Sequence, residues 1–154
     1  MKFLEKDLED IIFNAPNSEL GNRGLPITGL KIRQIRLGNY GISDLITINK
    51  KIKRKKGVII GHCIDIIVYE LKKDEVNKDT LSQLLRYMKG VHRYMKAFKS
   101  VEYTLQGVMI GKSTHDDIIY LSDVSEFEIF NYDYDYNGIS FEEVNNYSLK
   151  HEGF

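Results

Sequence analysis

A carboxylate and an ammonium group stand two residues apart near the middle of the chain. Glu70 and Lys72 end an apolar, β-branched run that starts at Val58, a composition typical of a central strand. Residues two apart on a strand point to the same face, about 7 Å from each other, so both side chains can serve one substrate group. This pair suits a magnesium site, where the carboxylate holds the ion and the lysine orients an attacking water.

A second acidic residue, Asp44, lies between isoleucines in an alternating segment that predicts a strand over Tyr40–Ile48. Burying a lone carboxylate among apolar side chains is costly unless the carboxylate is paired or bound to a metal ion. We therefore expect Asp44 to supply a second oxygen ligand to the same site. Taken alone, Glu70 and Lys72 would indicate only a surface ion pair, which is common and contributes little stability.

Three segments carry a likeness to a known family, namely Gly41-Ile42-Ser43-Asp44, Glu70-Leu71-Lys72 and Gln83-Leu84-Leu85-Arg86-Tyr87. Together they resemble the PD-(D/E)xK nuclease superfamily, and within it most closely the catalytic domain of NucS-type endonucleases. In that family a glutamine follows the Glu-x-Lys motif by eleven residues, and a tyrosine lies one helical turn beyond, as Gln83 and Tyr87 do here. The family's helical glutamate corresponds to Glu5, with Glu9 as the alternative. The resemblance covers residues 3 to about 95.

This resemblance implies an α/β fold with a restriction-endonuclease-like mixed β-sheet flanked by helices, and we expect residues 1–154 to form one such domain. It also implies cleavage of DNA phosphodiester bonds that depends on Mg²⁺ or Mn²⁺, and frequently a homodimer. The implied catalytic residues are Asp44, Glu70, Lys72, Glu5, Gln83 and Tyr87, of which Asp44, Glu70 and Glu5 would hold the metal. Two features depart from the family. The connection from Asp44 to Glu70 is longer than is typical, and we expect no amino-terminal DNA-binding domain.

Basic residues offer a surface for nucleic acid. Six of them fall in Lys50–Lys56, where we expect a solvated hairpin tip. We expect this tip to lie beside the site, where its cations could bind phosphates. The candidates are Arg33, Arg36, Lys50, Lys51, Lys53, Arg54, Lys55, Lys56 and Arg86, with Arg93 as a further one. Ordinary solvated charge is the alternative for all of them. Asp116–Ser148 contains no Lys or Arg, so we expect it to face away from DNA and its tyrosines to pack in strands or at a dimer interface.

The remaining pattern predicts the elements that position these residues. An amphipathic helix is expected first, then a loop as far as Gly29, strands, a second helix capped by Asp79, and further strands. The predicted ranges are a helix over Phe3–Phe13, strands over Leu30–Leu37, Tyr40–Ile48 and Val58–Lys72, a helix over Leu81–Val91, strands over Tyr103–Ile110, Asp117–Leu121 and Phe127–Tyr134, and a short helix or edge segment over Phe141–Tyr147.

Composition narrows the functional classes. The 154 residues carry 22 basic and 22 acidic side chains, so a nucleic-acid partner must be met by a local basic patch. A single cysteine, Cys63, excludes an intramolecular disulfide and a cysteine-based zinc cluster. No signal peptide or membrane span is visible, so we expect a cytoplasmic protein that does not interact with a membrane.

Two other classes remain open. One is a non-cleaving nucleic-acid-binding or accessory protein that keeps the nuclease-like fold. The presence of Asp44, Glu70 and Lys72 together argues against it, because a site that no longer catalyses a reaction has no physical need for buried charges. The other is a protein-interaction module that binds through the acidic, tyrosine-rich half. The sequence also leaves open whether the DNA would be mismatched, branched, single-stranded or ordinary duplex.

Overall fold

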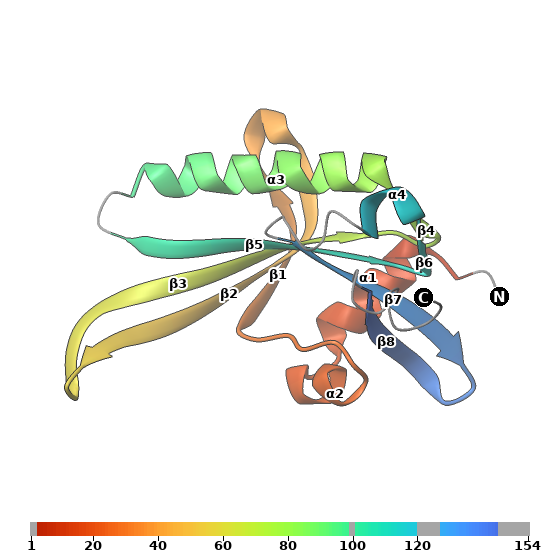
Figure 1. Cartoon of the computed structure of the whole chain (residues 1–154), viewed down its shortest axis with the longest axis horizontal. Helices are drawn as coiled ribbons and strands as arrows, with labels where there is room; N and C mark the ends of the chain where they lie inside the picture. Colours follow the sequence, from red (N-terminus) through yellow and green to blue (C-terminus); the bar gives the residue numbers. More distant parts are fainter. Residues whose placement is uncertain (1–2, 99–100, 120–126, 145–154) are drawn as a thin grey trace.

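A six-stranded mixed β-sheet forms the centre of the computed structural model, which describes residues 3–98, 101–119 and 127–144 (Figure 1). Its order is β1-β2-β3-β5-β7-β8. The strands are β1 (Leu30–Arg36), β2 (Ile42–Lys55), β3 (Val58–Leu71), β5 (Glu102–Gly111), β7 (Phe127–Asp135) and β8 (Gly138–Val144). The pairs β3–β5 and β5–β7 are parallel, and the other three pairs are antiparallel. A small parallel pair joins β4 (Glu75–Val76) to β6 (Ser113–Thr114).

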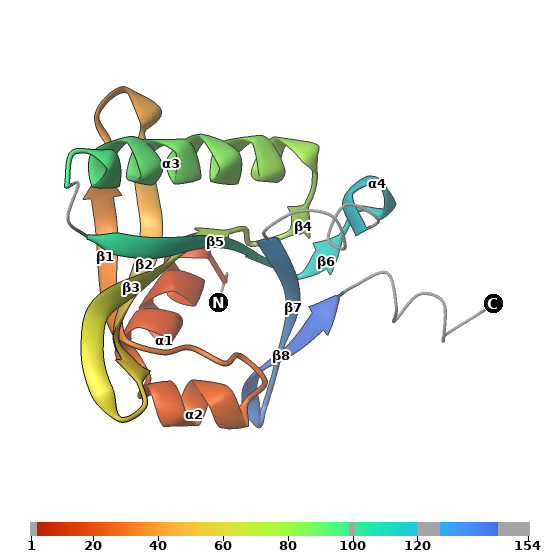
Figure 2. The ribbon, with the colours of Figure 1, turned by 60° about the vertical axis from the view of Figure 1, so that its left-hand side comes forward.

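Helices cover both faces of this sheet. The helices are α1 (Glu5–Asn14), α2 (Asn17–Asn22), α3 (Lys78–Lys96) and α4 (Asp116–Ile119), with a 3₁₀ turn η1 at Gly38–Tyr40. The long helix α3 lies on one face, whereas α1 and α2 lie on the other (Figure 2). This arrangement confirms the predicted α/β domain with a mixed sheet flanked by helices. No helix in the described ranges is long and apolar enough to cross a membrane.

Strand alternation divides the apolar core into two layers. On β3, Ile66 and Val68 belong to the cluster that contains Leu84 and Val91 of α3, while Tyr69 belongs to the cluster under α1. Because side chains alternate across a strand, Glu70 shares the α3 face with Val68. Asp44 shares that face in the same way, since its neighbour two residues on, Ile46, also packs in the α3 layer. The alternation of side chains along β2 and β3 therefore places Asp44 and Glu70 on the face of the sheet that α3 covers.

The helix that covers the site begins one turn earlier than the sequence suggested. The side chain of Asn77, not Asp79, is the N-cap, because its Oδ1 accepts hydrogen bonds from the backbone N–H groups of Asp79 and Thr80 at 3.0 and 3.2 Å. A cap of this kind satisfies backbone donors that the first turn leaves free. Leu84, Tyr87 and other buried residues of α3 follow the expected helical stripe.

Two predicted segments differ in type. The stretch expected as loop contains α2, where Pro16, with a φ of −59° and a ψ of 145°, precedes the first helical residue and Leu20 is fully buried. The strand expected from Asp117 is instead the short helix α4, and residues 120 and 121 lie outside the described part. Ile118 and Ile119 are both buried, and two adjacent apolar residues fit a helix turn as well as a strand. The segment from Phe141 proves to be part of the edge strand β8 as far as Val144.

The basic segment also differs from its prediction. Strand β2 continues through Lys55, so these residues form an antiparallel ladder with β3 and only Lys56-Gly57 make the hairpin turn. Both turn residues have positive φ, 52° and 79°, the backbone shape that matches the twist of paired strands. Hydrogen-bond pairing therefore keeps a highly charged sequence in a regular strand.

The tyrosines of the β7–β8 hairpin divide into two groups. Tyr132 is buried and its ring lies 5.7 Å from that of Phe3, as expected for strand packing. Tyr134 also packs on Phe3, with ring centres 5.5 Å apart, but it is exposed, as is Tyr136, so a place for these two at a dimer interface stays a prediction.

Candidate active site

Glu70 and Lys72 meet at the end of β3. Glu70 is only 4% exposed, and its Oε1 lies 3.8 Å from Nζ of Lys72. The backbone N–H of Lys72 donates to the carbonyl of Ile110 at 2.8 Å, which fixes the lysine just beyond the last residue of the strand. The structure thus brings together the two side chains that strand spacing placed on one face.

The other oxygen of Glu70 has no hydrogen-bond partner. Within the described residues, Glu70 Oε2 is buried and unpartnered, which is costly for a polar atom. Burial, and after it the charge of Asp44, raise the pKa of Glu70 to about 8, although the charge of Lys72 acts in the opposite direction. A carboxyl group in this position needs either a proton or a cation at neutral pH.

Asp44 lies beside this pair at the start of β2. Its Oδ2 accepts a hydrogen bond from the backbone N–H of Leu71 at 3.3 Å. Burial raises the pKa of Asp44, the hydrogen bond from Leu71 lowers it, and the charges of Glu9 and Glu5 raise it. Because Asp44 and Lys72 both act on the pKa of Glu70, the three side chains form one electrostatic unit.

The two acidic candidates of α1 have different surroundings. Glu5 is exposed, its Oε1 accepts from the backbone N–H of Lys73 at 3.3 Å, and its charge raises the pKa of both Asp44 and Glu70. Glu9 is 6% exposed and is held by Arg33 and by the side-chain amide of Gln34. Glu5 is therefore the acidic residue of α1 that acts on both carboxylates.

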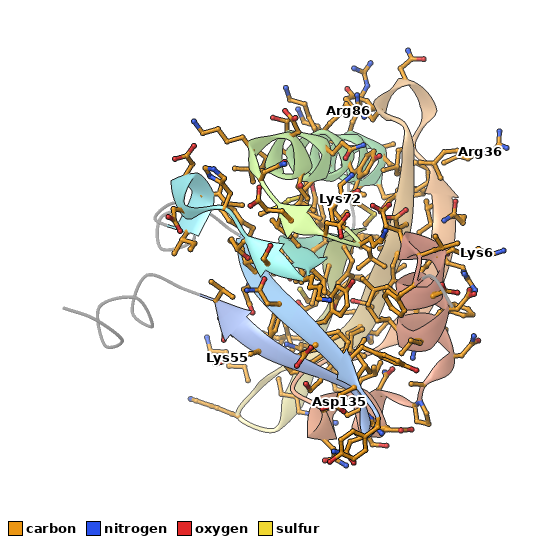
Figure 3. The ribbon with its side chains drawn as sticks, turned by 90° about the vertical axis from the view of Figure 1, so that its right-hand side faces the viewer. Lys6, Arg36, Lys55, Lys72, Arg86 and Asp135 are labelled. Carbon is orange, nitrogen blue, oxygen red and sulfur yellow. The ribbon has the colours of Figure 1, made fainter. Side chains whose placement is uncertain are left out.

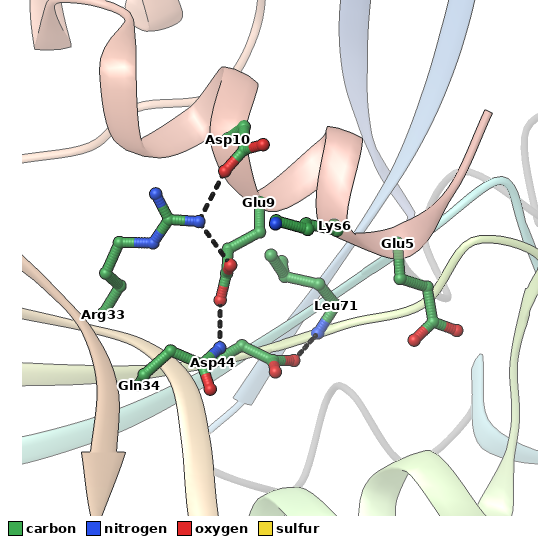
Figure 4. A pocket seen from close by; sticks show the side chains of 8 residues that line it. All are labelled: Glu5, Lys6, Glu9, Asp10, Arg33, Gln34, Asp44 and Leu71. Atoms are coloured by element: carbon green, nitrogen blue, oxygen red, sulfur yellow. Dashed lines mark hydrogen bonds and ion pairs between the residues drawn. The ribbon is translucent and has the colours of Figure 1, made fainter.

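A cleft of about 740 Å³ opens in front of Asp44 between α1 and the sheet. Figure 4 shows its lining, which is Glu5, Lys6, Glu9, Asp10, Arg33, Gln34, Asp44 and Leu71. Arg33 Nη2 lies 2.5 Å from Glu9 Oε2 and 2.5 Å from Asp10 Oδ1, and Gln34 donates to Glu9 Oε1 at 2.5 Å. Gln34 has a φ of 54°, a strained backbone that is found most often at functional sites.

Sequence reasoning missed the role of Arg33. The prediction assigns Arg33 to nucleic acid, but its guanidinium is engaged by two carboxylates of α1. We therefore leave it out of the proposed DNA surface. The contact joins residues more than twenty positions apart, so no spacing rule in the sequence points to it.

Helix α3 contributes the other family-like residues. Tyr87 is 6% exposed and packs against Gly41, where a Cβ atom would lie 3.0 Å from the Tyr87 ring. Gly41 has a φ of 105°, a backbone shape that glycine adopts without strain. Because it has no side chain, Gly41 also leaves room for the Tyr87 ring. Gln83 lies half-buried one turn before Tyr87.

Three arginines lie on the α3 side of the site. The Arg86 guanidinium lies 5.6 Å from the centre of the Tyr87 ring, and its charge lowers the pKa of Glu70. Arg36 and Arg93 line a shared hollow of about 560 Å³ beside η1. Figure 3 labels Arg86 and Arg36 on the upper side of the molecule, well away from Lys55.

The basic segment Lys50–Lys56 does not lie beside the site as predicted. It follows Asp44 along β2 and the turn after it, and at the usual rise per residue its members lie about 20 to 40 Å from Asp44 as measured along the strand. Two of its lysines form ion pairs with acidic residues of neighbouring strands. Lys51 Nζ lies 2.5 Å from Asp65 Oδ2, and Lys53 pairs with Glu102.

The carboxylates of the site suit a divalent cation that is held by few protein ligands. Among the described residues, no group of three or more His, Cys, Asp and Glu side chains is arranged to hold a metal ion, so Glu5 does not complete a compact triad. Mg²⁺, however, is commonly held by one or two carboxylates and several waters. The unpartnered Glu70 Oε2 beside Asp44 fits that need.

The comparison with solved structures identifies the fold. The crystal structure of a repair endonuclease from Pyrococcus abyssi is similar to the chain with a TM-score of 0.56 at 18% identity, covering 84% of this chain and 46% of that one. The chain has a NucS-like nuclease fold. An EndoMS-dsDNA2 complex gives a TM-score of 0.49 at 17% identity, covering 85% of this chain and 46% of that one. The chain thus spans about half the length of each. No protein-family model and no curated protein matches the sequence.

The structural similarity to the repair endonuclease confirms the NucS-type fold that the sequence motifs predicted. The NucS-like fold accounts for why residues from α1, β2, β3 and α3 meet at one place. The antiparallel β2–β3 pair brings the start of one strand beside the end of the other, which is where Asp44 and Glu70 lie. Helices α1 and α3 then approach this point from opposite faces.

Proposed function

We propose that the chain is an endonuclease that hydrolyses DNA phosphodiester bonds with the help of Mg²⁺ or Mn²⁺. One observation carries the proposal. In a fold shared with a repair endonuclease, a buried Glu70 with an unpartnered oxygen lies beside Asp44 and Lys72. Buried carboxyl groups with raised pKa values are characteristic of functional sites.

Asp44 and Glu70 would hold the cation. When bound, a divalent ion polarises a phosphate and lowers the pKa of a coordinated water. Glu70 has a pKa of about 8 and is protonated at neutral pH in the absence of a cation, so it would exchange its proton for the ion. The hydrogen bond from the Leu71 N–H to Asp44 leaves the second oxygen of Asp44 for the same task.

Lys72 would orient the attacking water and offset charge that develops on phosphorus. Its backbone is fixed to β5 through Ile110 and its ammonium stays within 3.8 Å of Glu70, so the lysine is already directed toward the proposed ion site. Glu5, on the α1 side, would accept a hydrogen bond from a metal-bound water.

Residues of α3 would support the substrate. Gln83 and Tyr87, one turn apart on α3, would hydrogen-bond the DNA backbone or the outer waters of the ion. Arg36, Arg86 and Arg93 lie on the same side and are suited to phosphate contacts that carry no sequence information. A homodimer is part of this proposal, because the family implied by the resemblance frequently acts as one.

A substrate panel tests the proposal. The purified protein is incubated with labelled duplex, flap, mismatched and single-stranded oligonucleotides in Mg²⁺ or Mn²⁺, beside Lys72→Ala and Lys73→Ala. Lys73 is the matched control, because it is the adjacent lysine and only its backbone N–H contacts Glu5. We expect product from the wild type and Lys73→Ala but not from Lys72→Ala. DNA binding without product in any arm would favour the non-cleaving alternative.

A further inference from the structure

The outer part of the β2–β3 hairpin stands apart from the sheet. The last residue of β2 that pairs with β1 is Ile48, and the first residue of β3 that pairs with β5 is Cys63. Residues Asn49–His62 therefore form a ribbon of two strands with no third strand beside it. Figure 1 shows this ribbon projecting from the body beyond the other strands.

This ribbon exposes aliphatic side chains. Ile52, Val58, Ile59 and Ile60 are each between 51% and 65% exposed. A two-stranded ribbon is only marginally stable in water on its own, and grouped exposed aliphatics mark a surface that meets a partner. The ribbon thus has the composition of a contact element.

The charge of the ribbon identifies that partner as a polyanion. Asn49–His62 contains six Lys and Arg residues and no Asp or Glu. Lys51 and Lys53 are paired with acidic residues of the sheet. The other four, Lys50, Arg54, Lys55 and Lys56, are exposed and form no ion pair within the described residues. A second copy of the same ribbon would repel them.

We infer that the ribbon Asn49–His62 is an arm that enters a groove of duplex DNA, with its cations on phosphates and its aliphatic side chains on base edges. The major groove is about 12 Å wide and admits a two-stranded ribbon. Lys56 lies twelve residues beyond Asp44 on β2 and its turn, at most about 40 Å away. At about 3.4 Å per base pair the arm therefore reaches up to roughly one helical turn from the proposed cleavage point. The inference rests on the DNA substrate proposed above.

The arm is also the feature that lengthens the connection between Asp44 and Glu70 beyond the family pattern. It adds contacts to the duplex without changing the residues at the site. The arm therefore increases affinity and fixes the direction in which the duplex leaves the site, while the reacting groups stay on the sheet and on α1.

A matched pair of charge variants tests the arm. Arg54, Lys55 and Lys56 are replaced by Gln in one protein, and the exposed Lys78, Lys96 and Lys112 in the other, so both lose three charges. Affinity for a duplex of about 30 base pairs is measured by fluorescence anisotropy in EDTA over a range of salt. We expect the arm variant to bind at least tenfold more weakly and its salt slope to fall by two to three, since each phosphate contact contributes about 0.9.

A second variant tests the aliphatic contacts. Changing Ile59 and Ile60 to Ser should weaken binding with little change in the salt slope, because no charge is removed. Equal losses in the arm and control charge variants would overturn the proposal. So would an arm variant that loses self-association in analytical ultracentrifugation but binds DNA normally, since the partner would then be another copy.

The measurement also separates this inference from the proposed function. Arm-dependent binding without cleavage in Mg²⁺ or Mn²⁺ would refute the nuclease activity and support the arm. Cleavage with affinity that does not depend on the arm would refute the arm alone.

Discussion

Replacing Glu70 by Gln tests the buried carboxyl that the site depends on. The two side chains have nearly the same shape, but Gln carries no charge at any pH. In the folded wild type the pKa of Glu70 is raised from 4.5 to about 8 by burial, and by the charge of Asp44. Between these two values the folded chain keeps a proton that the unfolded chain has released. The folded wild type therefore loses stability as the pH rises through this window.

The size of the effect follows from the width of the window. Stability attributable to Glu70 falls by about 1.4 kcal/mol for each pH unit inside the window and by less near its two ends, which gives about 3.5 kcal/mol between about pH 5 and pH 8. Glu70→Gln lacks this loss. We expect the free energy of unfolding of the variant, relative to the wild type, to rise by about 3.5 kcal/mol over the same range.

Urea unfolding in EDTA at both pH values measures this difference. Titrating groups outside the unit of Asp44, Glu70 and Lys72 act on both proteins and cancel. The variant Glu75→Gln, at an exposed position, serves as the control, and its difference from the wild type should not change with pH. A gap between wild type and Glu70→Gln that stays the same at both pH values would refute the reasoning. It would mean that Glu70 ionises in the folded protein without a penalty.

Three further predictions concern the surrounding residues. Mn²⁺ should raise the melting temperature of the wild type near pH 8 by mass action, and Asp44→Asn should abolish the gain in differential scanning fluorimetry. Arg33→Ala should lower stability by about 2 kcal/mol in urea unfolding, because it leaves the buried Glu9 carboxylate with the Gln34 amide but without its charged partner; an unchanged midpoint would contradict this. Gly41→Ala should cost about 2 kcal/mol, because its φ of 105° and its contact with Tyr87 exclude a Cβ; wild-type stability would show that the strand start adapts.

Part of the candidate site could be predicted from the sequence because it depends on the alternation of side chains along a strand and on the helical repeat. The alternation of a strand put Glu70 and Lys72 on one face, and the helical stripe of α3 put Gln83 and Tyr87 one turn apart. Both patterns need only neighbouring residues, and tertiary contacts did not override them. The meeting of Asp44 with Glu70 was expected from the cost of burying a lone carboxylate and from the family likeness, since β2–β3 pairing is not encoded by spacing.

Other features could not be read from the sequence, for physical reasons. The ion pair of Arg33 with Glu9 joins β1 to α1, and its partners are identified only once the helix docks on the sheet. The charged segment Lys50–Lys56 suggests a loop by composition, yet ladder hydrogen bonds to β3 keep it in strand. That continuity moves the cations away from the site, and so changes their proposed role from local phosphate contacts to a distant arm.

Proton release on metal binding tests the central claim most directly. If Glu70 exchanges its proton for a cation, Mn²⁺ binding near pH 7 should release close to one proton per ion. The release is obtained by calorimetric titration in buffers with different ionisation enthalpies. The wild type should show this value, and Glu70→Gln should show neither the release nor the wild-type affinity. Binding of Mn²⁺ to the wild type without proton release, or no binding at all, would contradict the account.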